Sequence, residues 1–214
     1  MTYKATGFII SKRFSRERDR IFVIYTKEYG KIEALAQGVL KLESKLAGNL
    51  ELLSKASFLI ARGRVFDRVA GIDIEERFLA ITQNFQKLVV ALYSAEILYS
   101  TVHEKAPDAS LFTLLEDFFS ELDALGAKTE TRTALYLAHL FIIKLSLILG
   151  YRSNSRVAAQ FLDALAQKRL SAFLSNPAPH FAPMLAQEFL NEQLHKKLNT
   201  QSYIDFLVKE TLKV

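Results

Sequence analysis

Residues 1–78 show the alternation of apolar and polar positions that is typical of β-strands. Five runs are predicted to form strands, over residues 5–14, 20–27, 31–37, 52–62 and 65–75. In the second run, Ile21, Val23 and Tyr25 face one side, and the residues between them are apolar as well. We therefore expect this strand to be central or covered on both faces.

Five short strands within 78 residues predict a small closed barrel. Gly30 supplies the backbone freedom for the reversal between the second and third runs, and Gly63 lies in the turn between the last two. An OB-type barrel fits this pattern, and an SH3-like barrel would show the same periodicity.

After residue 78 the apolar positions change to a helical period. Helices are predicted from residue 85 to about 107, and over 108–125, 129–149, 154–169, 183–198 and 203–213. The third of them is apolar on nearly every side from Leu135 onward, so it should be the buried centre of a bundle. Its longest apolar run, 140–149, is too short to span a bilayer. The chain is thus predicted to be an α+β protein, with a barrel domain over 1–78 and a helical domain over 79–214.

The charge of the chain is uneven along its length. Residues 1–80 hold 15 lysines and arginines against 10 aspartates and glutamates, which accounts for the whole net charge of +5. Residues 81–214 hold 13 of each. A basic excess confined to one domain favours a polyanionic partner, although small β-domains also carry lysines for solubility.

The cations of the first domain cluster near its predicted turns. OB folds bind single strands by combining a basic groove with aromatic side chains on which bases stack, and Phe14 lies within the first basic cluster. A solvated hairpin and a solvated loop would explain the same pattern. The predicted nucleic-acid contacts are Arg13, Arg20, Lys31, Lys41, Lys45, Arg62 and Arg64.

The same region resembles the N-terminal domain of the RecO family of bacterial recombination mediators. The resemblance rests on Asp19-Arg20, Thr26, Tyr29-Gly30-Lys31, Gly38, Lys41, Ser44-Lys45-Leu46-Ala47-Gly48 and Leu50, and on Leu149-Gly150-Tyr151 at the end of the apolar helix. It implies an OB-type barrel that binds single- and double-stranded DNA and anneals complementary strands. It also implies association with RecR and single-stranded-DNA-binding protein, indirect action on RecA, a cytoplasmic location and no enzymatic activity.

The chain departs from the family pattern at several points. Many members carry cysteines for a zinc-binding excursion, whereas this chain has no cysteine and its four histidines are dispersed, so no metal and no cofactor are expected. His139-Leu140 stands where members often have an arginine pair ahead of Phe141, and Gln37 replaces a lysine. The N-terminal residues show no apolar core of signal-peptide length.

A partner site is predicted on the helical domain. In this family, the tail of single-strand-binding protein is acidic and ends in an apolar residue with a free carboxylate, so it needs an apolar groove with a cation at its edge. The candidates are Lys144, Arg132 and Arg152. Lys144 could instead extend its ammonium from a buried helix to water.

Two rival functions remain open at this point. An OB-fold RNA-binding protein or RNA chaperone would show the same basic barrel. A metal-dependent nuclease would use an acidic helix face, for which a solvated surface is the simpler explanation; its members are Glu116, Asp117, Glu121 and Asp123.

Overall fold

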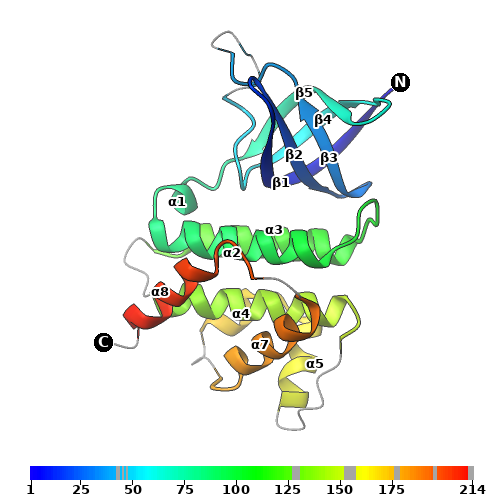
Figure 1. Ribbon diagram of the computed structural model, residues 1–214. Helices are drawn as coiled ribbons and strands as arrows, with labels where there is room; N and C mark the ends of the chain where they lie inside the picture. Colours follow the sequence, from blue (N-terminus) through cyan, green and yellow to red (C-terminus); the bar gives the residue numbers. More distant parts are fainter. Residues whose placement is uncertain are drawn as a thin grey trace. The chain divides into compact units, whose positions relative to one another are not determined.

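The computed structural model describes residues 1–214 except 42–43, 45, 47, 127–130, 152–157, 176–178, 195–196 and 212–214. The chain forms two compact units. The first comprises Met1–Phe78 together with Val102–Phe112, and the second comprises Leu79–Thr101 together with Thr113–Val214. Figure 1 shows the five strands in the first unit and the helices that make up the second.

The first unit is a closed five-stranded barrel. Its strands are β1 (Thr2–Arg16), β2 (Asp19–Thr26), β3 (Gly30–Ala36), β4 (Lys55–Ala61) and β5 (Asp67–Glu76). They pair in the order β1-β2-β3-β5-β4, and β4 returns to β1. All pairs are antiparallel except β3–β5, which is parallel. This order confirms the predicted OB-type barrel and sets aside the SH3-like alternative.

The interior of the barrel is filled by one face of each strand. Phe22 and Ile24 of β2 pack there against Phe58 and Ile60 of β4, and all four are at most 2% exposed. On the opposite face of β2, the alternate residues are also buried, so the prediction of a strand covered on both sides is confirmed.

The cover comes from the segment Val102–Phe112, which the sequence pattern had assigned to the helical region. Phe112 packs on Phe8 of β1 with ring centroids 5.4 Å apart, and the Tyr25 hydroxyl donates to the Asp108 carbonyl at 3.4 Å. Gly30 has φ +66°, and a Cβ atom at this position would lie 2.4 Å from the Ala106 carbonyl oxygen. The segment therefore lies directly on the β2–β3 hairpin, and only glycine allows that approach.

The second unit contains most of the helices. Their bounds are α1 Leu79–Thr82, α2 Phe85–Thr101, α3 Ala109–Ala124, α4 Thr131–Ile148, α5 Ala159–Gln167, α6 Ser171–Leu174, α7 Ala182–Gln193 and α8 Gln201–Thr211. The first turn of α3 belongs to the barrel unit. Helix α2 ends six residues before Pro107, earlier than predicted, because Val102, which is itself buried, begins the segment that lies on the barrel.

Helix α4 is the centre of this unit, as predicted. It packs against α2, α5, α7 and α8, and side chains on all sides of it are buried, including Leu137, Phe141 and Leu145. Among the described helices it is also the one whose length and apolar composition would suffice to cross a membrane. Since 61% of it is buried within the protein, a core helix accounts for that composition.

Candidate nucleic-acid interface

The β1–β2 hairpin presents an aromatic ring to solvent with a cation on it. Phe14 is 81% exposed and lies opposite Arg20 in the strand register. The Arg20 guanidinium carbon lies 3.7 Å from the Phe14 ring centroid, and its Nη1 donates to the Asp19 carbonyl at 3.0 Å. An exposed ring that already carries a stacked guanidinium has the elements of a base-stacking platform.

Lys41 lies at the same end of the barrel. The Asp19 carboxylate accepts the Gly38 N–H at 2.7 Å, and the Arg18 carbonyl accepts the Leu40 N–H at 3.2 Å. These bonds hold the chain after β3 against the β1–β2 turn. Lys41 itself is exposed and shares a surface hollow with Asp19 and Gly38. Lys45 lies outside the described residues.

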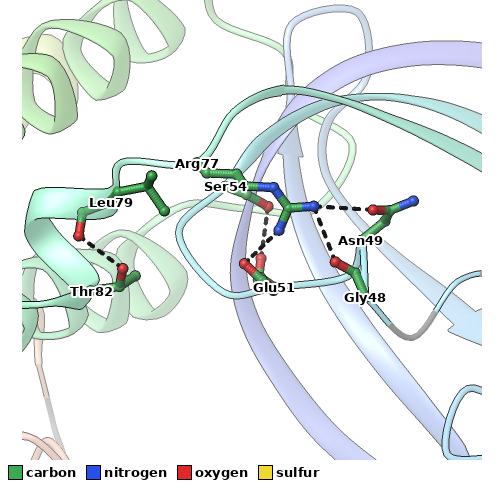
Figure 2. Close-up of polar contacts among 7 residues, drawn as sticks. All are labelled: Gly48, Asn49, Glu51, Ser54, Arg77, Leu79 and Thr82. Carbon is green, nitrogen blue, oxygen red and sulfur yellow. Dashed lines mark hydrogen bonds and ion pairs between the residues drawn. The ribbon is translucent and has the colours of Figure 1, made fainter.

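The far end of the β3–β4 loop is anchored by Arg77, as Figure 2 shows. Its guanidinium donates to the Gly48 carbonyl and to Asn49 Oδ1, both at 3.1 Å, and pairs with the Glu51 carboxylate at 2.9 Å. Ser54 Oγ donates to the Glu51 carbonyl at 2.8 Å. Both ends of the loop that carries Lys41 are therefore tied to the barrel unit.

A second group of cations lies at the β4–β5 turn. Arg62 and Arg64 are exposed, and the Arg62 guanidinium carbon is 5.6 Å from the Tyr3 ring centroid. Tyr3 donates its hydroxyl to the Asp67 carboxylate at 2.6 Å; burial and this carboxylate raise the pKa of the phenol. The ring is therefore fixed as a neutral phenol, and it positions the cation next to it.

A row of residues paired across β1, β2, β3 and β5 runs between these two groups of cations. Arg13 is opposite Ile21, Ile21 is opposite Leu35, and Leu35 pairs with Arg68 across the parallel β3–β5 contact. Arg68 is exposed, and Arg13 forms an ion pair with Glu33. Arg68 was not among the predicted contacts, because its position beside β3 depends on a parallel pairing that periodicity does not reveal.

Lys31 occupies a different environment from the other predicted contacts. It is 9% exposed, and its carbonyl accepts the Lys105 N–H at 3.0 Å. Burial lowers the pKa of its ammonium, while the carboxylates of Glu104 and Glu33 act in the opposite direction. Its charge is thus covered by the segment 102–112 and offset by acids, so we leave Lys31 out of the candidate interface.

The structure places two of the predicted partner residues on different faces of α4. Lys144 is half-buried and donates to the Lys168 carbonyl; burial and the nearby Arg169 lower the pKa of its ammonium, and Asp117 opposes them. Arg132 lies along a groove of about 630 Å³ between α4, α7 and α8, lined by Leu135, His139, Ile204 and Val208. Arg152 lies outside the described residues.

Two acids of the proposed nuclease face serve structural roles. Asp117 is 4% exposed and accepts from Arg169 Nε and the Leu170 N–H, each at 2.6 Å. Asp123 accepts the Ile81 N–H at 2.9 Å. Asp117 is therefore not part of a solvated face, and within the described residues no group of three histidines, aspartates or glutamates is arranged to hold a metal ion.

Comparisons with known proteins agree with this architecture. The family model described as "Recombination protein O N terminal" matches residues 1–78. The DNA repair protein RecO of Dehalococcoides mccartyi is 31% identical over 192 residues, which are 90% of this chain and 72% of that protein. The RecO protein of Trichodesmium erythraeum is 35% identical over 141 residues, 64% of this chain and 49% of the relative.

The chain is shorter than these relatives. It spans about half the length of the Trichodesmium protein, and 56% of the RecO protein of Pelotomaculum thermopropionicum, to which it is 33% identical over 149 residues. The match to the Dehalococcoides protein nevertheless extends through both the barrel and most of the helical unit. On the strength of that match and of the N-terminal family model, the chain belongs to the RecO family of DNA repair proteins.

Proposed function

We propose that the barrel binds single-stranded DNA and that the chain acts in the cytoplasm as a recombination mediator without enzymatic activity. In this role it binds and anneals strands and, with RecR, helps to load RecA onto strands covered by single-stranded-DNA-binding protein. The parts played by RecR and RecA follow from the family resemblance. The DNA contact is supported by the barrel itself.

The observation that carries the DNA proposal is the Phe14–Arg20 pair. An aromatic ring that is 81% exposed, with a guanidinium 3.7 Å from its centroid, stands on the first hairpin of an OB-type barrel. OB folds bind strands with the β1–β2 and β4–β5 turns and with the face of β2 and β3, part of which the segment Val102–Phe112 covers here. Cations lie at both of those turns: the half-buried Arg20 and, beside it on the chain after β3, the exposed Lys41 at the first, and the exposed Arg62 and Arg64 at the second.

Annealing requires no chemistry beyond this surface. Two complementary strands repel one another through their phosphates, and cations that neutralise these charges release counterions and bring the strands together. Such contacts are independent of sequence, so the surface would hold any strand while bases pair. The name DNA repair protein, which the relatives carry, favours DNA over RNA.

The DNA contact is tested through its salt dependence. We expect the double variant Lys41→Gln/Arg64→Gln to lower the slope of log K against log salt by about 1.4 on single strands, about 0.7 for each lost phosphate contact. Every strand should be weakened by a similar factor. The measurement is anisotropy titration of one labelled oligonucleotide at several salt concentrations.

The matched control is Lys168→Gln/Lys197→Gln, which removes the same charge from exposed positions of the helical unit. It should leave the slope at the parent value. Parallel lines for Lys41→Gln/Arg64→Gln and the parent would show that these side chains do not touch the strand. Titration with an RNA of the same sequence distinguishes the two nucleic acids: tighter binding of RNA would favour an RNA chaperone.

For the tail of single-strand-binding protein we propose a site on the helical unit. The groove beside α4 is mostly apolar and is lined by two cations, Arg132 and Lys209, and one acid, Asp205, a balance that suits an acidic tail with an apolar end and free carboxylate. Lys144, by contrast, is engaged with the Lys168 carbonyl and lies near Asp117. We therefore place the proposed tail contact at Arg132 rather than Lys144.

For this site we expect Arg132→Gln to weaken binding of a synthetic tail peptide about tenfold, the effect of losing one hydrogen bond to a charged group. Lys144→Gln should bind the peptide as the parent does. Isothermal titration calorimetry measures both, and circular dichroism checks that each variant is folded. The reverse result would return the site to Lys144.

A further inference from the structure

A second concave surface lies on the barrel unit, and the proposed phosphate contacts do not explain its lining. It has a volume of about 690 Å³ and runs between β3, the β2–β3 turn, the β4–β5 turn and residues 104–107. All of these segments belong to one compact unit. The volume is within the range of sites that hold a small ligand or one part of a larger one.

The walls of this groove are aromatic and held in position. Tyr3 and Tyr29 meet edge to face with ring centroids 4.6 Å apart. Tyr3 is fixed by its bond to Asp67, and the Tyr29 backbone N–H donates to Thr26 Oγ1 at 3.0 Å. Phe66, at 37% exposure, adds a third ring from the β4–β5 turn. Rigid rings around a hollow favour a flat ligand.

The charges in the groove disfavour a phosphate in its interior. Four carboxylates line it, against three cations, although the domain as a whole is basic. The carboxylates belong to Glu28, Glu33, Asp67 and Glu104. Two of the three cations, Arg62 and Arg64, are exposed on the β4–β5 turn. A ligand that fits this arrangement places its negative charge near the exposed arginines and its hydrogen-bond donors near the carboxylates.

We propose that the groove receives one nucleobase turned out of the bound strand, with the adjoining phosphates at Arg62 and Arg64. This inference rests on the proposed binding of single-stranded DNA. Carboxylates accept hydrogen bonds from exocyclic amino groups, which cytosine, adenine and guanine have and thymine lacks. The groove is therefore expected to bind bases that have an amino group in preference to thymine. The free energy needed to turn a base out is lowest in a single strand, where no base pair is broken.

A basic side chain of a partner protein is the other ligand that carboxylates and aromatic rings attract. The two exposed arginines that line the groove oppose it, because they repel a cation that approaches them. A nucleotide meets the same arginines with an attractive charge. The observations thus favour the base, and binding of a basic peptide in the groove would contradict this assignment.

The experiment compares two strands of equal length, an oligothymidylate of sixteen nucleotides and the same strand with four evenly spaced cytosines. We expect the parent protein to bind the cytosine-containing strand about threefold more tightly, the effect of one modest hydrogen bond made by a fraction of bound strands. Phe66→Ala and Glu104→Gln should each reduce that ratio to about one. Arg64→Gln should weaken both strands and keep the ratio, because phosphate contacts carry no base information.

Each other outcome has a definite meaning. Equal affinities of the parent for both strands would overturn the base site and leave DNA binding intact. An unchanged ratio in both Phe66→Ala and Glu104→Gln would do the same, with melting temperatures confirming that the variants are folded. Binding of neither strand would overturn the base site and the proposed function together. An arginine-containing peptide that binds the parent and not Phe66→Ala would assign the groove to a protein partner instead.

Discussion

Replacing Asp117 with alanine is expected to destabilise the helical unit by about 2–3 kcal/mol. The Asp117 carboxylate accepts the backbone N–H of Leu170, a residue with no exposed surface. Without that acceptor the N–H is left buried and unpaired, and a buried unpaired donor lowers the free energy of unfolding by about 1–3 kcal/mol. The position also loses the acid that offsets the charge of Lys144 and pairs with Arg169. Urea denaturation followed by circular dichroism measures the change.

Two control variants identify which contact of Asp117 matters. Asp117→Asn keeps an oxygen for the Leu170 N–H and should lose much less stability than alanine. Arg169→Ala should leave the denaturation midpoint near the parent value, because 72% of that side chain is in water. Equal losses in the alanine and asparagine variants would show that the ion pair dominates. A catalytic role would show a different result, with stability unchanged and a metal-dependent activity lost.

Acidification should weaken the protein through His139. This side chain lines the groove beside α4, and its burial lowers the pKa of the imidazole to about 4. An unfolded chain binds the proton near pH 6.5, whereas the folded chain resists it until about pH 4. The contribution of His139 is therefore constant above pH 6.5 and is lost as the pH falls, by about 1.4 kcal/mol per pH unit.

The variant His139→Gln isolates this effect because it has no imidazole to protonate. Between pH 7 and pH 5 the parent should lose about 2 kcal/mol more free energy of unfolding than the variant. The carboxylates titrate in both proteins, so their contribution cancels in the difference. If the two proteins lose the same amount, then His139 is already accessible to solvent. The groove proposed for the tail would then be more open than the structure shows.

Much of the fold could be predicted from the sequence. Period-two alternation located all five strands, and the run around Phe22 and Ile24 showed, by being apolar on both faces, that it would be covered. The nearly uniform apolar character of residues 135–149 was enough to place that helix at the centre of its bundle. These predictions succeeded because the spacing of apolar residues along a segment indicates which face of the helix or strand is turned away from water.

Boundaries were less well predicted. The helix predicted from residue 85, which is α2, ends at Thr101 and not near Pro107, because the residues that follow lie on the barrel. The strand predicted from residue 52 begins at Lys55, since the Leu53 N–H donates to the Ile9 carbonyl at 2.8 Å and Leu53 has φ +68°. In both cases a contact with a distant segment ended a pattern that the local sequence would have continued.

The exposure and the neighbours of the candidate site residues depended most on such contacts with distant segments. By itself the sequence determined that the barrel unit is basic and that its cations gather at turns. Only the tertiary structure decided that Lys31 is covered by a segment about seventy residues later, that Arg68 completes a row with Arg13, and that Asp117 is buried. The physical reason is that charge and period are local properties, whereas exposure depends on which remote segment packs over a side chain.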